Sequence, residues 1–96
     1  MDEKTLLTDL AEIIAIPSVY SAPTPDAPYG EDCRRALEWF VDKARAYGLN
    51  AANVDNRCAY AEYGDGGECI GILAHLDVVP AGNGWTKEPF GGEIDY

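Results

Sequence analysis

A chain of 96 residues, 47% of them hydrophobic and 25% charged, has the composition of one small globular domain or of part of a larger one. The formal net charge is −10, and the seven Lys and Arg residues form no cluster, which argues against binding to nucleic acids or to an anionic membrane. No stretch approaches the ~20 apolar residues of a spanning helix, and the start does not resemble a secretory signal. Three cysteines without CxxC spacing favour reduced thiols, so we expect a cytoplasmic protein.

Two amphipathic helices are predicted in the first half of the chain. Leucines and isoleucines at spacings of three and four predict a first helix with one buried face, which ends before Pro17. The second helix is predicted from residue 31 to about residue 47, and Gly48 is a natural left-handed cap. Cys33 lies on the apolar stripe of this helix, so we expect it in the core and not as a nucleophile.

Residues 17–30, between the two predicted helices, carry four prolines and are predicted to be a loop. After the second helix, the spacing of apolar residues changes from the helical period to the two-residue period of a strand. Residues 49–55 and 58–63 are predicted strands joined by a turn at 56–57. The continuous apolar run 69–74 predicts a strand that is covered on both faces. The fold class is therefore α/β, with two helices followed by three to four strands of a mixed sheet.

The only histidine of the chain follows this apolar run. In an extended segment, His75 and Asp77 point to the same side, and the carboxylate can fix the tautomer of the ring, as in many zinc sites. The more common role of such a histidine is structural, and one His with one Asp cannot complete a catalytic zinc site, which needs about three protein ligands. Both roles stay open on the spacing alone.

A longer motif surrounds this pair. HLDVVPAG followed by GNGWTKEPFGGEI resembles the first metal-binding motif of the zinc-dependent exopeptidases, which include aminoacylases, succinyl-diaminopimelate desuccinylase and glutamate carboxypeptidases. The matching residues are His75, Asp77, Val78, Val79, Pro80, Gly82, Trp85, Pro89 and Phe90. Upstream, the stretches IPSV, YGL and YAEYGDG resemble the bacterial Xaa-His, or carnosinase-like, dipeptidase branch. The resemblance covers essentially the whole chain and is most specific at residues 71–92.

The resemblance implies roles for individual residues. His75 matches a direct zinc ligand, and Asp77 matches the active-site residue that orients this ligand. Trp85, Pro89 and Phe90 have packing as their expected role. The family uses two zinc ions, with cobalt or manganese as alternatives, and hydrolyses the amide bond of dipeptides or N-acyl amino acids with a metal-bound water.

Other parts of the family pattern have no match in this sequence. These are a bridging Asp, a Glu general base and the remaining metal ligands. We therefore expect residues 1–96 to be a truncated N-terminal portion of the catalytic domain, without the lid or dimerisation domain. The piece itself should be inactive and should self-associate through open strand edges. The alternative is a small non-catalytic α/β interaction module in which His75 and Asp77 are structural.

Overall fold

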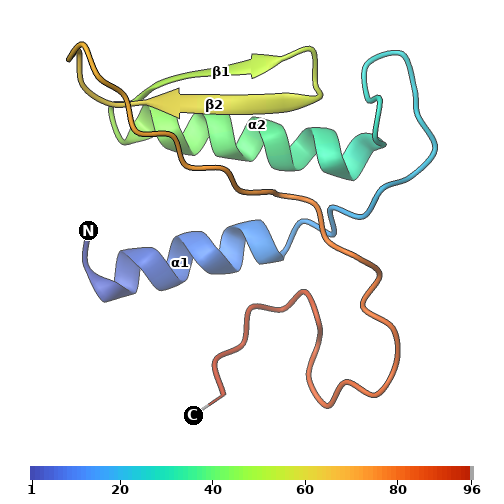
Figure 1. Cartoon of the computed structure of the whole chain (residues 1–96). Helices are drawn as coiled ribbons and strands as arrows, with labels where there is room; N and C mark the ends of the chain where they lie inside the picture. Colours follow the sequence, from blue (N-terminus) through green and yellow to red (C-terminus); the bar gives the residue numbers. More distant parts are fainter. Residues whose placement is uncertain (96) are drawn as a thin grey trace.

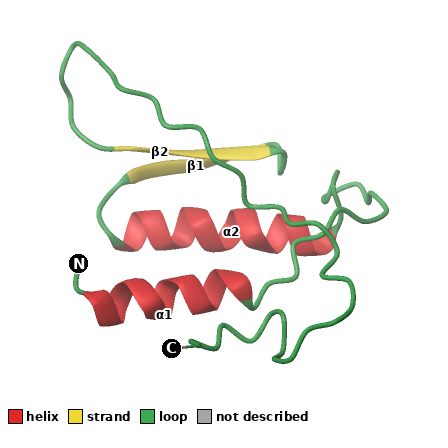
Figure 2. Cartoon of the chain, turned by 60° about the horizontal axis from the view of Figure 1, so that its bottom comes forward, coloured by secondary structure: helices red, strands yellow, loops and turns green. Residues whose placement is uncertain are grey.

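The computed structural model describes residues 1–95 and contains two helices and one two-stranded antiparallel sheet. Helices α1 (Glu3–Ile14) and α2 (Glu31–Ala46) precede strands β1 (Asn50–Val54) and β2 (Cys58–Glu62). The sheet covers one side of α2, and α1 lies along another side (Figures 1 and 2). No helix in the described part of the chain is long and apolar enough to cross a membrane.

Helix α1 has well-defined ends but no buried side chain. The Asp2 carboxylate accepts a hydrogen bond from the Thr5 amide at 2.8 Å and caps the first turn, and the helix ends before Pro17. The prediction of one buried face is wrong for this structure, because Leu6 and Leu10 are exposed. The reason is that α1 faces α2 with its polar side, which forms the hydrogen bonds and ion pairs between the two helices.

Helix α2 carries most of the small core. Its buried residues are Cys33, Ala36, Leu37, Val41 and Ala44. Val41 and Ala44 pack against Ala51 of β1. Gly48 adopts a φ of 84°, and the Leu49 amide donates to the carbonyl of Ala44 at 3.0 Å, which closes the helix as predicted.

The predicted hairpin is formed, with its turn shifted by one residue. Strands β1 and β2 pair with Val54 opposite Cys58. Asp55 and Asn56 both have a φ of 57°, and the Arg57 amide donates to the Val54 carbonyl at 3.0 Å. The turn is thus centred on residues 55–56, because these two positions take the left-handed conformation that a tight hairpin turn requires.

The strand predicted for residues 69–74 is not formed, so the sheet has two strands in the described part of the chain. Ile70, Ile72 and Leu73 are 93%, 90% and 101% exposed, respectively. A strand exists only when a neighbour satisfies its backbone groups, and within residues 1–95 no strand pairs with this segment. The α/β class holds, whereas the expected three to four strands are not present.

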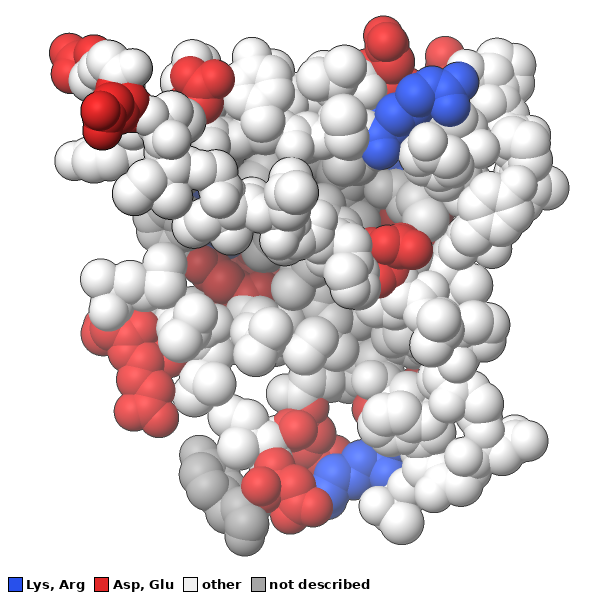
Figure 3. All heavy atoms as spheres, in the orientation of Figure 1, with Lys and Arg blue, Asp and Glu red and all other residues white. Residues whose placement is uncertain are grey.

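Charged side chains are spread over the surface. On the face drawn in Figure 3, acidic side chains occur at several separate places, and the few basic side chains lie apart from one another. The acidic side chains on this face therefore do not form one concentrated patch.

Candidate functional site

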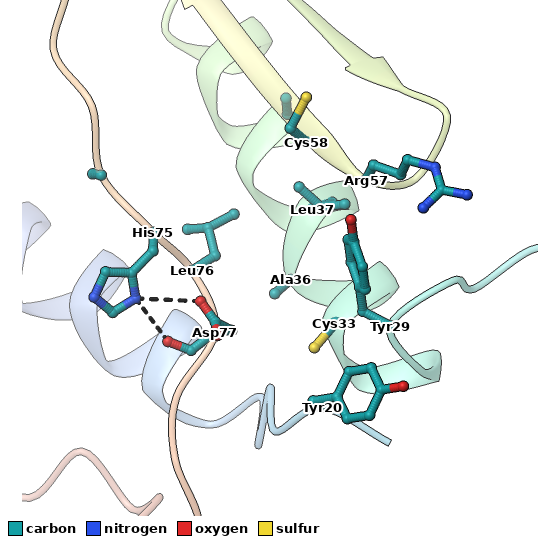
Figure 4. Close-up of a pocket in the computed structure, with 12 residues that line it drawn as sticks. Tyr20, Tyr29, Cys33, Ala36, Leu37, Arg57, Cys58, His75, Leu76 and Asp77 are labelled. Atoms are coloured by element: carbon teal, nitrogen blue, oxygen red, sulfur yellow. Dashed lines mark hydrogen bonds and ion pairs between the residues drawn. The ribbon is translucent and has the colours of Figure 1, made fainter. Parts of the chain in front are cut away.

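The segment that carries His75 is attached to the loop after α1 by Ser18. The Ser18 hydroxyl donates to the carbonyl of Leu76 at 2.7 Å, and the Ser18 carbonyl accepts from the amide of Val78 at 3.0 Å. The side chain of Leu76 points toward α2 (Figure 4). The main chain is therefore held on both sides of Asp77.

His75 and Asp77 lie side by side, on the side of the segment opposite to Leu76 (Figure 4). The ring atom Nδ1 of His75 is 3.4 Å from Oδ1 of Asp77 and 2.9 Å from the main-chain oxygen of the same residue. The His75 side chain is 82% exposed. The structure thus brings together the two residues that the alternation pattern placed on one side, although the segment is extended without being part of a sheet.

The contacts of Nδ1 determine which ring nitrogen is available. Both of its partners are acceptors, so in the neutral ring Nδ1 carries the proton and Nε2 keeps its lone pair. A histidine ligand needs such an unprotonated nitrogen. The nearer partner is the main-chain oxygen of Asp77, because 3.4 Å is longer than an ordinary N–H···O hydrogen bond. The sequence predicted that the carboxylate would hold the ring.

These residues fit one ligand of a metal ion and not a complete site. Among residues 1–95, no group of three or more His, Cys, Asp or Glu side chains could hold a metal ion. A catalytic zinc ion needs about three protein ligands. His75 can therefore serve a metal only where further ligands join it.

A cavity of about 350 Å³ lies behind the segment, between residues 74–77 and the hairpin–α2 layer. Tyr20 and Tyr29 from the proline-containing loop line it together with Leu37, Leu76 and Arg57 (Figure 4). Most of these surfaces are apolar. The loop that was predicted from its prolines therefore forms one wall of a pocket next to the candidate site.

Cys33 also lines this cavity and is buried, as the helical pattern predicted. Burial raises the pKa of the Cys33 thiol, and the negative charges of Asp77 and Asp32 raise it further. The thiol donates weakly to the Ser18 carbonyl, with 3.5 Å between sulfur and oxygen. A thiol that stays protonated is a poor nucleophile, so Cys33 is a packing residue.

The second half of the motif forms a loop that contacts itself. The indole of Trp85 donates to the carbonyl of Ala81 at 2.8 Å, across Gly82, whose φ is 74°. Pro89 and Phe90 are partly buried. These contacts are compatible with the packing role expected for the three residues, and none of them lines the cavity beside His75.

Ser18 is the site residue that the sequence pattern did not single out. It belongs to the IPSV stretch, which indicated the family resemblance and the end of the first helix but no role for the serine. The available signal was a lone hydroxyl between two apolar residues, which does not indicate a partner far along the chain. The contact with Leu76 joins residues 58 positions apart.

Comparisons with known proteins identify dipeptidases as relatives of this chain. It is 36% identical over 94 residues to "Putative dipeptidase YtjP" of Bacillus subtilis (strain 168), which covers 96% of this chain and 20% of that protein. It is 39% identical over 90 residues to a "Putative dipeptidase" of Staphylococcus aureus (strain USA300), covering 92% of this chain and 19% of that protein. No family model matches the chain. The chain spans about a fifth of the length of the curated relatives it matches.

The similarity to proteins that carry this name thus extends along nearly the whole chain. The names of these relatives confirm the resemblance to dipeptidases that was seen in the sequence. The names of these relatives do not mention a metal ion.

Proposed function

We propose that this chain forms the part of a metal-dependent dipeptidase that supplies one imidazole ligand, His75, with Asp77 beside it as an active-site residue. The observation that carries the proposal is the orientation of the ring. Nδ1 is held by acceptors of Asp77, which leaves Nε2 unprotonated, and the ring is exposed at the edge of a pocket. A structural histidine would be expected to have both nitrogens satisfied inside the protein.

The proposed reaction is hydrolysis of the amide bond of a dipeptide or N-acyl amino acid, and the names of the relatives support this substrate class. A bound zinc ion, or cobalt or manganese in its place, would polarise the amide carbonyl and acidify a water molecule. In this chain, His75 would hold the ion, and Asp77 would keep the ring in the correct tautomer and direction. The free thiols of Cys33, Cys58 and Cys69 support a reducing, cytoplasmic location.

Because residues 1–95 offer no group of three ligands, the 96-residue chain itself should bind zinc weakly and should not turn over substrate. The remaining ligands and the general base would come from other parts of the longer enzyme. The activity of the whole enzyme is therefore best tested in a protein that contains these parts.

The ligand role can be tested on the chain itself by nuclear magnetic resonance of the imidazole nitrogens. His75 is the only histidine, so its signals need no assignment by mutation. Because thiolates are metal ligands and the thiols of Cys58 and Cys69 are exposed, the titration should use the Cys58→Ser/Cys69→Ser variant. We expect zinc to shift the Nε2 signal, and His75→Ala to weaken binding by at least ~10-fold, as loss of the ligand requires.

Asp65→Asn is the matched control, because it removes an exposed carboxylate in the loop after β2 that does not line the cavity beside His75. Its zinc affinity should equal that of the parent. An Nε2 signal that does not move at millimolar zinc, or binding that persists in His75→Ala, would show that the imidazole is not a ligand.

The enzymatic role can be tested in a chimera in which this chain replaces the matching fifth of the Bacillus subtilis relative. We expect the chimera to hydrolyse dipeptides, and both His75→Ala and Asp77→Ala to abolish most of that activity. Hydrolysis that survives His75→Ala would instead favour the structural role of this histidine.

A further inference from the structure

Ser18 is the only buried polar or charged residue in the described part of the chain, with 1% of its surface exposed. Burying a hydroxyl is unfavourable unless it is hydrogen-bonded, and this hydroxyl donates to the carbonyl of Leu76. Its carbonyl accepts the amide of Val78. Both of these partners lie in the segment that carries His75, and the Ser18 carbonyl also accepts weakly from the Cys33 thiol of α2.

The two contacts fix the rotation of this segment about its own axis. Leu76 packs toward α2, but apolar packing has little directional preference. Hydrogen bonds to a carbonyl before Asp77 and to an amide after it do have a direction. Within residues 1–95, the Val78 bond is the only main-chain hydrogen bond between residues 70–80 and the rest of the protein. Ser18 therefore determines which side of the segment faces the solvent.

The effect reaches the imidazole through the main chain. The carbonyl of Asp77 lies between the two residues that Ser18 holds, and this carbonyl is the nearest partner of His75 Nδ1, at 2.9 Å. If residues 76–78 rotate, the carbonyl moves and the ring loses its acceptor. The chain of contacts is thus Ser18 to the main chain of Leu76 and Val78, then the Asp77 carbonyl, then His75.

We propose that Ser18 is a positioning residue, which sets the direction and the tautomer of the His75 ring by holding residues 76–78. Its relevance to metal binding rests on the proposed function, whereas its effect on ring geometry does not. Ser18 acts on the ligand through the main chain and has no contact with substrate or metal in this proposal.

The test compares Ser18→Ala with Ser18→Thr, which keeps the hydroxyl, in the Cys58→Ser/Cys69→Ser chain. In Ser18→Ala we expect the Val78 amide to exchange with solvent about tenfold faster, since one hydrogen bond that holds the segment is lost. The His75 Nδ1 proton signal should broaden, and zinc affinity should fall several-fold. Ser18→Thr should restore all three readouts toward those of the parent.

Val41→Ala is the matched control for a general loss of stability, because Val41 is buried in the core of α2 and the hairpin. It should lower the unfolding midpoint without changing the His75 ring signals. If Ser18→Ala leaves both the Val78 exchange rate and the His75 signals unchanged, or if Val41→Ala changes the ring signals equally, the positioning role is wrong.

The ring signals and the zinc titration separate this inference from the proposed function. If Ser18→Ala alters the ring signals but zinc shifts the Nε2 signal of no variant, the positioning role is supported and the ligand role fails. If zinc binds through His75 equally well in the parent and in Ser18→Ala, and the ring signals of the two also agree, the ligand role is supported and the positioning role fails.

Discussion

At the scale of single residues, the orientation of His75 depends on a main-chain atom as much as on a side chain. The oxygen nearest to Nδ1 belongs to the Asp77 backbone, and the carboxylate of the same residue is 0.5 Å farther away, at 3.4 Å compared with 2.9 Å. A main-chain acceptor cannot be removed by a side-chain substitution. The ring can therefore keep its tautomer when the carboxylate is changed.

This geometry predicts the behaviour of Asp77→Asn. Because the variant retains the main-chain oxygen, we expect the nitrogen spectra of the neutral His75 ring to show the proton on Nδ1, as in the parent. Zinc affinity should still fall by about 10-fold, since a carboxylate next to a ligand histidine also raises the basicity of the ring. A switch of the ring proton to Nε2 would show that the carboxylate controls the tautomer.

Cys33 offers a second prediction at this scale, because only the thiolate form of a cysteine is nucleophilic. Burial, and then the charges of Asp77 and Asp32, raise the pKa of the Cys33 thiol, so fewer molecules carry the thiolate at a given pH. We expect iodoacetamide at pH 8 to label Cys33 at least ~10-fold more slowly than the exposed Cys58 and Cys69. Mass spectrometry of the labelled chain measures the three rates.

The same labelling experiment should also show why Cys33 reacts slowly. In urea the three cysteines should react at similar rates, because unfolding removes both the burial and the nearby charges. The labelling rate of Cys33 should level off at a higher pH in the folded chain than in urea, because the fold raises the pKa of this thiol. Equal rates for all three thiols in the folded chain would contradict the buried position.

At the scale of elements, α1 and α2 are joined by polar side chains. The Tyr47 hydroxyl donates to Asp9, and the Trp39 indole donates to Glu12 at 3.0 Å. The ammonium group of Lys43 lies 3.1 Å from an oxygen of Asp9 and 3.0 Å from an oxygen of Glu12. These ion pairs lie at the surface and are partly exposed, and such pairs stabilise a protein by little, so this contact should be one of the weakest in the molecule.

These contacts determine whether acid strengthens or weakens the contact between α1 and α2. The hydrogen bond from Tyr47, and then Lys43, lowers the pKa of Asp9, and the hydrogen bond from Trp39, and then Lys43, lowers the pKa of Glu12. A lowered pKa stabilises the folded state above the ordinary carboxyl range, and this stabilisation is lost as the pH falls through the lowered value. Acid should therefore detach α1 from α2 before the core unfolds.

We expect Trp39 fluorescence, measured in the Trp85→Phe variant, to change in acid at a pH where the circular dichroism of α2 and the hairpin is still unchanged. Glu12→Gln/Asp9→Asn should remove this early change, since it no longer has carboxylates to protonate at the contact. A single transition in which fluorescence and circular dichroism coincide would show that α1 does not separate on its own.

At the scale of the whole molecule, a thin layered unit carries an apolar segment that it does not cover. Residues 69–74 form an extended trace that crosses the view of Figure 1, and Figure 2 shows that the chain after β2 stands away from the hairpin before it returns. Within residues 1–95 no strand pairs with them, and the side chains of Ile70 and Ile72 are almost fully exposed. Exposed apolar side chains next to open backbone groups favour association with another strand.

We therefore expect the isolated chain to self-associate in a concentration-dependent way, as measured by analytical ultracentrifugation. Ile72→Lys should shift the distribution toward monomer, because a charge on an exposed edge opposes pairing. Val79→Lys is the matched control, since it changes an exposed apolar residue outside this segment. A parent chain that stays monomeric at millimolar concentration would contradict the prediction.

The sequence by itself determined the features that depend on near neighbours. The start of α2 at Glu31, its left-handed cap at Gly48 and the hairpin follow from side-chain periodicity and from the conformational freedom of single residues. The placement of His75 and Asp77 on one side follows from the alternation of side chains along an extended backbone. These features require no knowledge of distant contacts.

The tertiary structure alone decided which distant groups meet. It showed that Ser18 holds the segment of His75 from 58 residues away and that α1 contacts α2 through polar groups. It also showed that residues 69–74 do not become a strand in this chain. An apolar run reports only that a segment favours burial, whereas a strand forms only where another backbone is present to accept and donate its hydrogen bonds.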